Sequence, residues 1–473
     1  MKYSGLFTDF YELTMMQGYM LQGKNEEVVF DMFFRRQPFS GGYSIFTGLS
    51  DILDTLENIS FPEEDLDYLR SLKIFQDNFL EYLKDFKFTG SVYAMDEGSI
   101  IFPNEPIIRI HSTIIEAQLI ESLILNTINF QTLIATKAAR VSYASGGSTI
   151  LEFGLRRAQG FDGALTASRA AFIGGADATS NTLAGKIYGI PVKGSMAHSW
   201  IMAFDSELEA FRKFTELYPD SAILLIDTYD TLGSGIKNAI IVGLEQKKKG
   251  KSISVRLDSG DFFYLSREIR KQLNAAGLEN AEIVVSNDLD EEIIHQLLTD
   301  GATIDTWGVG TNLVTGGTDS AFGGVYKLAA KKIGGIFSAT IKVSNNAVKT
   351  TNPGIKQVYR FYNKDGSAAA DLIALEGEDI PDTRPYTFYH PMYFHDKFTL
   401  SNYGRIKPML SLKMEKGKRL QGILSIKDLQ NNVKNNLKCF DTSYKRIINP
   451  HIYKVSLSEK LKSLKSELLD VYK

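Results

Sequence analysis

The chain has 473 residues, more than one hydrophobic core usually organises, so we expect two or more domains. Hydrophobic residues make up 44% and charged residues 23%, and the net charge of −3 lacks the basic excess of a dedicated nucleic-acid binder. The single cysteine, Cys439, cannot form an intrachain disulfide. No signal-peptide pattern and no apolar run of membrane length is seen, so we expect a cytoplasmic protein without a membrane partner.

The N-terminal part mixes helices and strands. Asp9, with Glu12 three residues later, predicts the start of a helix. Residues 28–34 and 43–47 predict strands, and 88–110 predicts further β-structure punctuated by glycine and proline. Apolar residues at helical spacing then predict one long buried helix: Ile115, Leu119, Ile120, Leu123, Ile124 and Ile128.

From about residue 135, short strands alternate with helices. The predicted strands are 149–153, 222–226, 252–257, 283–286, 303–307 and 325–328. Helices are predicted over 262–276 and over 289–299, the second started by Asp288 with Glu291 three residues on. Repeated strand–helix units imply a parallel sheet, and six or more of them in about 200 residues favour an α/β barrel over an open sheet.

Beyond residue 335 the pattern is again β-like and rich in loops. It ends in a predicted helix whose apolar face is formed by Leu457, Leu461, Leu464 and Leu468. We therefore divide the chain into three regions, 1–134, 135–334 and 335–473.

The segment 252–261 carries the most chemical information. Strand alternation sends Ile253, Val255 and Leu257 to one side, and Arg256 and Asp258 to the other. In a barrel the charged pair would point inward at the carboxyl-terminal mouth, where barrel enzymes perform catalysis. The alternative is a buried ion pair that only closes the barrel.

Two further loops follow predicted strands. Arg156 and Arg157 stand among glycines after the first of these strands, and guanidinium groups match phosphate or carboxylate oxygens. Their alternative role is an exposed cationic loop. Gly308 and Gly310 precede Thr311 in a turn suited to phosphate, although a turn of this kind is commonly an ordinary loop.

His198 follows a predicted strand-to-loop exit. A lone histidine among small residues is more often structural than catalytic, but its position favours a role in the site. Ser195 and Ser199 flank it without the pattern of a Ser/His/Asp triad. Neither a Walker-type phosphate loop nor a strand-borne G-x-G-x-x-G is present, and His390 and His395 lack accompanying metal ligands.

Several segments together resemble the nicotinate phosphoribosyltransferase family. They occur in matching order over about 320 residues, a span that makes the resemblance specific. These segments are 8–11, 33–36, 152–160, 194–199, 255–261, 309–311 and 323–328, with 457–461 as a weaker match.

The resemblance implies a type II phosphoribosyltransferase. The fold would be an irregular TIM-like α/β barrel over 135–334 with an additional α/β sandwich domain formed from 1–134 and the C-terminal region. The enzyme would join nicotinate to 5-phosphoribosyl 1-diphosphate, giving nicotinate mononucleotide and diphosphate for NAD biosynthesis. ATP, with Mg²⁺, would drive this ATP-dependent ligase through a transient phosphohistidine. The resemblance also implies a homodimer with shared active sites.

The resemblance implies roles for individual residues. His198 would be phosphorylated by ATP, and with Arg256 and Asp258 would form the catalytic group. Nicotinate would be held by Ser195, Arg256 and Tyr11, the last stacking on the pyridine ring from the same or the neighbouring subunit.

The phosphoribosyl diphosphate would be bound by loops at strand ends. Thr311, with the backbone of Gly308 and Gly310, would bind the 5-phosphate. Arg156 and Arg157 would bind the diphosphate or the nicotinate carboxylate. Three carboxylates are candidates for ribose hydroxyls or for a magnesium ion bridged by water: Asp258, Asp261 and Asp288.

Three alternatives remain open at this point. A relative in the same superfamily uses nicotinamide instead of nicotinate. A phosphate-binding barrel isomerase or aldolase would act on a sugar phosphate without releasing diphosphate, and it would leave Tyr11 and His198 without roles. A non-catalytic interaction protein would not bind phosphoribosyl diphosphate.

Overall fold

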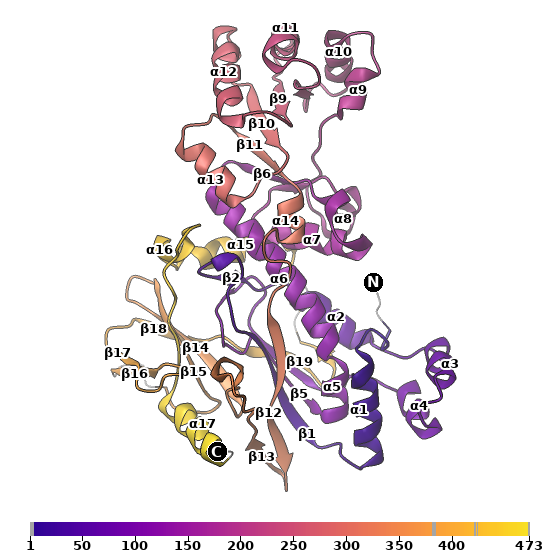
Figure 1. Cartoon of the computed structure of the whole chain (residues 1–473), viewed down its shortest axis with the longest axis vertical. Coiled ribbons are helices and arrows are strands. Elements are labelled where there is room, and N and C mark those ends of the chain that lie inside the picture. The colour runs from indigo at the N-terminus through magenta and orange to yellow at the C-terminus, as the bar shows by residue number, and fades with distance from the viewer. Residues whose placement is uncertain (1–3, 381–384, 421, 423, 472–473) are drawn as a thin grey trace. The chain divides into compact units, whose positions relative to one another are not determined.

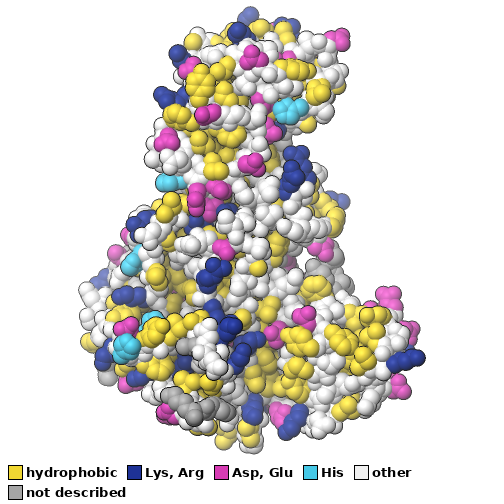
Figure 2. Space-filling view, viewed as in Figure 1, with side chains coloured by type: hydrophobic (Ala, Val, Ile, Leu, Met, Phe, Trp, Pro, Cys, Tyr) yellow, Lys and Arg dark blue, Asp and Glu magenta, His cyan; other side chains and the backbone are white. Residues whose placement is uncertain are grey.

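The structure is a computed structural model that describes residues 4–380, 385–420, 422 and 424–471. The chain folds into two compact units. The terminal unit comprises Met1–Leu133 with Ala321–Lys473, and the central unit comprises Ile134–Ser320 (Figure 1). Among the described residues, no helix combines the length and apolarity that crossing a membrane requires. On the face shown in Figure 2, acidic and basic side chains are interspersed.

A seven-stranded antiparallel sheet organises the terminal unit. Its order is β13-β12-β1-β5-β3-β19-β20, with β1 Glu27–Phe34, β3 Ser91–Ala94, β5 Ile108–Thr113, β12 Gly324–Ile333, β13 Ile336–Ala339, β19 Ser411–Glu415 and β20 Lys418–Arg419. The strand predicted over 325–328 is real, but its expected place in the alternating parallel region is wrong. It pairs antiparallel with β1, where Phe30 opposes Leu328.

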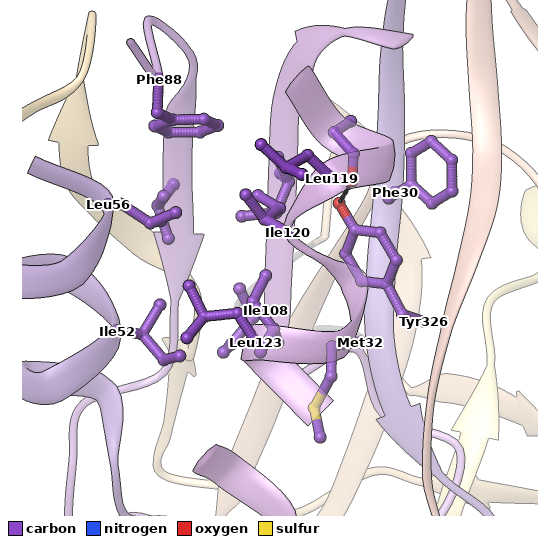
Figure 3. Packing of buried hydrophobic residues seen from close by; sticks show 14 of the residues in the cluster. Phe30, Met32, Ile52, Leu56, Phe88, Ile108, Leu119, Ile120, Leu123 and Tyr326 are labelled. Carbon is purple, nitrogen blue, oxygen red and sulfur yellow. Dashed lines mark hydrogen bonds between the residues drawn. The ribbon is translucent and has the colours of Figure 1, made fainter. Parts of the chain in front are cut away.

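Helices of this unit contribute to the hydrophobic core drawn in Figure 3. They are α1 Phe10–Leu21, α2 Leu49–Asn58, α3 Glu63–Ser71, α4 Asp77–Lys84, α5 Ile114–Leu119 and α6 Glu121–Ala144, beside the short strands β2 Ser44–Ile45 and β4 Ile100–Ile101. The long helix predicted from Ile115 is therefore two helices, because Ile120 leaves helical geometry and ends α5. In the core, the Tyr326 hydroxyl donates to the Ala117 carbonyl at 3.0 Å.

Helix α1 begins directly after Asp9, as predicted. The reciprocal side-chain cap that the pattern predicts is absent among the described residues, because the Asp9 carboxylate accepts a hydrogen bond from the Ser122 hydroxyl at 2.6 Å. The predicted start of the helix is confirmed, and the predicted capping of that start by the Asp9 and Glu12 side chains is wrong.

The C-terminal region adds a second sheet to the terminal unit. Its order is β17-β16-β21-β15-β14-β18, with β14 Lys356–Tyr362, β15 Ala368–Leu375, β16 Tyr386–Tyr389, β17 Lys397–Leu400, β18 Arg405–Pro408 and β21 Val455–Leu457. The helices are α15 Ile426–Lys438, α16 Thr442–Lys445 and α17 Glu459–Val471. Leu457, predicted on the last helix, lies instead in β21, where it pairs with Ile373.

The central unit is built on a six-stranded parallel sheet in the order β7-β6-β11-β10-β9-β8. The strands are β6 Thr149–Glu152, β7 Ala178–Thr179, β8 Ile223–Leu225, β9 Ser254–Leu257, β10 Glu282–Ser286 and β11 Thr306–Val309. The predicted parallel α/β arrangement is confirmed. A closed barrel is not confirmed, because within the described ranges no strand pairing joins the short edge strands β7 and β8.

Helices connect these strands or follow the last of them (Figure 1). They are α7 Gly160–Gly174, α8 Thr182–Tyr188, α9 His198–Met202, α10 Glu207–Leu217, α11 Ile236–Lys247, α12 Phe262–Ala275, α13 Glu291–Thr299 and α14 Thr311–Thr315. Helix α12 lies where it was predicted. Helix α13 starts at Glu291 with Asp290 as its N-cap, so Asp288 does not begin it; Asn287 and Asp288 have φ values of 86° and 30°, outside helical geometry.

Candidate active site

The loops with the candidate residues leave the same edge of the parallel sheet of the central unit. Residues 153–157 follow β6, 226–230 follow β8, 258–261 follow β9, 287–290 follow β10 and 310–311 follow β11. All strand pairings in this sheet are parallel, so their carboxyl ends share one edge. Open α/β sheets bind ligands at this edge.

Strand β9 places its side chains as the alternation predicts. Val255 and Leu257 are fully buried, whereas Arg256 and Asp258 retain 14% and 28% side-chain exposure. The apolar residues fix the strand in the sheet, and the charged pair faces the site.

Arg256 is the centre of a polar network. Its Nε–H donates to the Ser286 hydroxyl at 2.9 Å, and Nη1 donates to the Ser195 hydroxyl at 2.5 Å and to the Met196 carbonyl at 3.2 Å. Nη2 donates to Asp258 Oδ1 at 3.1 Å. The guanidinium plane is thus fixed by oxygens from several segments of the chain. Two of these oxygens belong to hydroxyl groups.

Asp258 is held as firmly as Arg256. Its Oδ1 accepts from the Ser286 hydroxyl at 2.5 Å, and its backbone N–H donates to Asp227 Oδ2 at 2.8 Å. The same Asp227 oxygen accepts from the Ser259 hydroxyl at 2.7 Å. Burial raises the pKa of Asp258, but the hydrogen bond from Ser286 and the charge of Arg256 outweigh burial and lower the pKa below its ordinary value. The carboxylate is therefore ionised at neutral pH.

His198 is the first residue of α9, and its side chain is 41% exposed. Its Nδ1 lies 3.1 Å from the Thr228 hydroxyl, and its Nε2 lies 4.0 Å from Asp258 Oδ2. The nearby Ser195 hydroxyl accepts from Arg256 and donates to the Met196 carbonyl at 3.3 Å, so these residues do not form a Ser/His/Asp triad. The structure brings His198, Ser195, Arg256 and Asp258 together, as predicted.

Arg156 and Arg157 lie in a one-turn 3₁₀ helix, Leu155–Arg157, directly after β6. Both are exposed. In the part of the chain that the structure describes, neither side chain makes a hydrogen bond or an ion pair. Their donors are available to an anion at the edge of the sheet.

The buried carboxylate of Glu152 shapes the start of this arginine turn. It accepts hydrogen bonds from the Gly154 N–H, from the Ser168 hydroxyl at 2.8 Å and from the Thr179 hydroxyl at 2.5 Å. A Cβ at Gly154 would lie 2.2 Å from Val314, so only glycine fits there. The backbone path into the turn is therefore fixed by hydrogen bonding and packing.

The turn predicted from Gly308 to Thr311 is wrong at its start, because β11 extends to Val309. Gly308 lies inside β11 in register with Ser286, and a Cβ there would lie 2.6 Å from the Phe153 ring. Close packing against Phe153 therefore accounts for this glycine. Gly310 and the exposed Thr311 lie beyond the strand, at the edge of the sheet.

Asp261 and Asp288 are both exposed at the sheet edge. Asp261 caps α12 by accepting a hydrogen bond from the Tyr264 N–H at 3.0 Å. Asp288 follows Asn287 in the left-handed turn after β10. No group of three or more His, Cys, Asp or Glu placed to hold a metal is found among the residues described.

Tyr11 belongs to the terminal unit, where it lies on the first turn of α1 and is 49% exposed. Burial and then a hydrogen bond with the Glu12 carboxylate raise the pKa of its phenol well above the ordinary value. The ring is thus uncharged at neutral pH and presents an aromatic surface to solvent.

Three residues of the network were missed by the sequence analysis. Ser286 joins Arg256 to Asp258, Asp227 holds the backbone after β9, and Thr228 contacts His198. Ser286 ends a predicted strand, and Asp227 directly follows one. The rule that selects polar residues at strand ends could therefore have listed Ser286 and Asp227 as candidates, without indicating what they contact.

Comparison with known proteins identifies the family. Three family models cover most of the chain: the nicotinate phosphoribosyltransferase N-terminal domain matches residues 6–129, the family model 149–354 and the C-terminal domain 355–465. The nicotinate phosphoribosyltransferase of Bacillus subtilis is 44% identical over 457 residues, which cover 96% of this chain and 93% of that protein. The one from Caenorhabditis elegans is 37% identical, covering 96% and 92%.

Solved structures agree with the sequence matches. The crystal structure of human nicotinic acid phosphoribosyltransferase superposes with a TM-score of 0.84 at 30% identity, covering 98% of this chain and 99% of that one. Nicotinate-nucleotide pyrophosphorylase from Pyrococcus furiosus shares the fold, with a TM-score of 0.72 at 21% identity over 92% and 95% of the two chains. The chain belongs to the nicotinate phosphoribosyltransferase family.

Proposed function

We propose that this protein transfers the phosphoribosyl group from 5-phosphoribosyl 1-diphosphate to nicotinate, giving nicotinate mononucleotide and diphosphate for NAD biosynthesis. The observation that carries the proposal is the network in which Arg256 binds Ser195, Ser286 and Asp258 at the carboxyl edge of the parallel sheet. This network presents a guanidinium group in a fixed orientation, which suits binding of a carboxylate such as that of nicotinate. The chain also belongs to the nicotinate phosphoribosyltransferase family.

Nicotinate would be bound through its carboxylate. Arg256 now donates to the Ser195 hydroxyl, whose own proton is donated to the Met196 carbonyl at 3.3 Å, and an incoming carboxylate would accept from both residues. Tyr11 would stack on the pyridine ring, contributed by the neighbouring subunit of a homodimer. The exposed, uncharged phenol ring is suited to this contact.

Phosphoribosyl diphosphate would be bound along the sheet edge. The 5-phosphate would meet Thr311 and the Gly310 backbone, and the diphosphate would meet Arg156 and Arg157, whose donors are exposed. Because Gly308 is inside the strand, its part would be to let β11 pack closely rather than to bind phosphate.

In the reaction, the nicotinate ring nitrogen donates its electron pair to ribose C1. The bond from C1 to the diphosphate oxygen breaks, and its electrons leave with diphosphate. Positive charge develops on the ribose, and the ionised Asp258 carboxylate would stabilise this charge. Asp261 and Asp288 would accept hydrogen bonds from ribose hydroxyls. A magnesium ion bound to the diphosphate would neutralise part of its charge, with these carboxylates reaching it through water.

ATP would drive the reaction through His198. A ring nitrogen of His198 would take the γ-phosphoryl group, ADP would leave with the electrons of the broken P–O bond, and later hydrolysis would release phosphate. The exposed ring beside Thr228 and Asp258 supports this role. The added negative charge next to Arg256 would couple ATP cleavage to substrate affinity.

The direct test is incubation of the protein with nicotinate, phosphoribosyl diphosphate, Mg²⁺ and ATP, following nicotinate mononucleotide and diphosphate by chromatography. Parallel reactions with nicotinamide measure selectivity. We expect nicotinate to be strongly preferred, since an amide cannot form a charged pair with Arg256. Preference for the amide would overturn the assignment.

The role of His198 is tested separately. His198→Ala should abolish ATP hydrolysis and labelling of the protein by γ-labelled ATP, while weaker ATP-independent synthesis persists. His295→Ala, on the exposed face of α13, is the matched control and should label normally. Normal ATP coupling in the His198 variant would refute the role.

A further inference from the structure

The turn between β10 and α13 has an unusual backbone. Asn287 and Asp288, with φ of 86° and 30°, are consecutive non-glycine residues in the left-handed region. Residues with a Cβ adopt this region at a cost in free energy, although asparagine and aspartate tolerate it best. Both side chains are exposed at the sheet edge, so the surrounding structure must hold the turn.

The chain after the turn is anchored in the interior. Leu289 is 1% exposed, and Asp290 caps α13 by accepting from two backbone N–H groups. Glu291 is 2% exposed, and its carboxylate forms ion pairs with Arg140 Nε at 2.8 Å and with Lys137 Nζ at 2.5 Å, both from α6. Burial raises the pKa of Glu291, but the two cations outweigh burial and lower it. This anchor holds the chain at the C-terminal end of the turn.

Asn312 makes a further contact at this end of the turn. Its side-chain N–H donates to the Leu289 carbonyl at 3.2 Å, directly after Asp288. Asn312 is also the residue next to Thr311 at the start of α14. One amide therefore joins the loop after β11 to the turn after β10.

We propose that Asn312 is a positioning residue that holds the Asn287–Asp288 turn in its left-handed conformation and ties it to Thr311. Phosphoribosyl diphosphate would then meet Asp288 and Thr311 in a geometry formed before it binds. The inference rests on the proposed function, because it names what fixes the binding loops for that substrate. Asn312 acts through its neighbours and needs no contact with the substrate.

The expected effect follows from the loss of one neutral hydrogen bond. Removing the amide should weaken binding of phosphoribosyl diphosphate by about fivefold to tenfold, because an organised turn must then form at the moment of binding. Asn312→Ala tests this, and the isosteric Asn312→Leu is a second variant should alanine loosen α14. Asn274→Ala, an exposed asparagine on α12, is the control and should bind as wild type does.

A second substitution separates positioning from general loosening. Glycine adopts positive φ without penalty, so Asn287→Gly should favour the turn without its tether. In the Asn312→Ala, Asn287→Gly double variant, affinity should return toward the wild-type value. A structural defect elsewhere in α14 would not respond to glycine in a different loop.

The measurement is calorimetric titration of each folded variant with phosphoribosyl diphosphate and Mg²⁺. If the wild-type protein does not bind this ligand, the proposed function itself fails. If it binds and both Asn312 variants bind equally well, Asn312 has no positioning role. If they bind weakly and Asn287→Gly does not restore affinity, the tether does not act through the turn, and the inference is overturned.

Discussion

Arg256→Lys tests the network at its centre. The substitution keeps the positive charge next to Asp258 but replaces a planar fork by a single ammonium. In the wild-type protein three guanidinium nitrogens make four hydrogen bonds, to Ser286, Ser195, Met196 and Asp258. One ammonium nitrogen cannot occupy all three positions. The variant therefore keeps the positive charge and removes the planar arrangement of donors, so the effect of geometry can be measured apart from that of charge.

The magnitude can be worked from these contacts. We expect the ammonium to keep its bond to Asp258 and to lose at least two of the others. A hydrogen bond to a charged group contributes about 1.5 kcal/mol or more, so two of them amount to about 3 kcal/mol. If this difference is expressed fully in the transition state, kcat/KM for nicotinate falls about 100-fold.

The assay is initial-rate formation of nicotinate mononucleotide at saturating phosphoribosyl diphosphate, with kcat and KM for nicotinate determined separately. Arg267→Lys is the matched control, because Arg267 is exposed on α12 and contacts only the Phe263 ring at 5.0 Å among the interactions described. It should change kcat/KM by less than twofold. A value for Arg256→Lys within threefold of wild type would show that geometry at Arg256 does not matter.

Three further substitutions test other parts of the structure. Gly308→Ala should lower the free energy of unfolding by about 1–3 kcal/mol in urea denaturation, because the new Cβ lies 2.6 Å from the Phe153 ring; an unchanged midpoint would contradict the packing account. Glu152→Gln should cost about 1–3 kcal/mol in the same assay, since the amide NH₂ has no acceptor among the three donors now bound to this carboxylate; wild-type stability would show that the hydroxyls reorient without cost. Lys465 is buried and, among the described residues, donates to two neutral oxygens; burial followed by the charge of Lys356 lowers its pKa to about 8. In the unfolded chain the lysine pKa is about 10.4. Between the folded and unfolded pKa values the unfolded chain therefore binds more protons at Lys465 than the folded protein does. The free energy of unfolding consequently rises with pH across this window. Lys465→Met should remove that rise and be more stable at pH 7. If the free energy of unfolding depends on pH in the same way in the two proteins, the lowered pKa of Lys465 is refuted.

The sequence predicted local features that depend on neighbouring residues. Alternation along 252–258 placed Arg256 and Asp258 on the side opposite Val255 and Leu257, as the structure confirms. It could not predict which strands pair. The strand at 325–328 has the same character as those before it, and its antiparallel pairing with β1 depends on residues almost 300 positions away.

The site was predicted less completely than the strands. Ser286 was assigned only as the end of a strand, because its contacts with Arg256 and Asp258 exist only once β9 and β10 are adjacent. Thr228 contacts His198 across 30 positions for the same reason. Hydroxyl residues carry no charge pattern, so a single sequence does not distinguish those that join a network from those that face water.

Comparison with another ion pair supports the proposed role of Arg256 and Asp258 in binding a ligand. Arg360 and Asp371, in the terminal unit, form a structural pair whose side chains are 3% and 0% exposed. Arg360 makes three bonds to that one carboxylate, the shortest 2.6 Å long, so its charge is compensated within the fold. Arg256 makes one bond of 3.1 Å to its aspartate, and its remaining donors meet neutral oxygens in a partly exposed position. A pair that only closed the sheet would be expected to resemble the first arrangement, because a buried charge is stabilised by full pairing. The arrangement at Arg256 leaves a positive charge that an anion can still compensate, which is what recognition of a carboxylate requires.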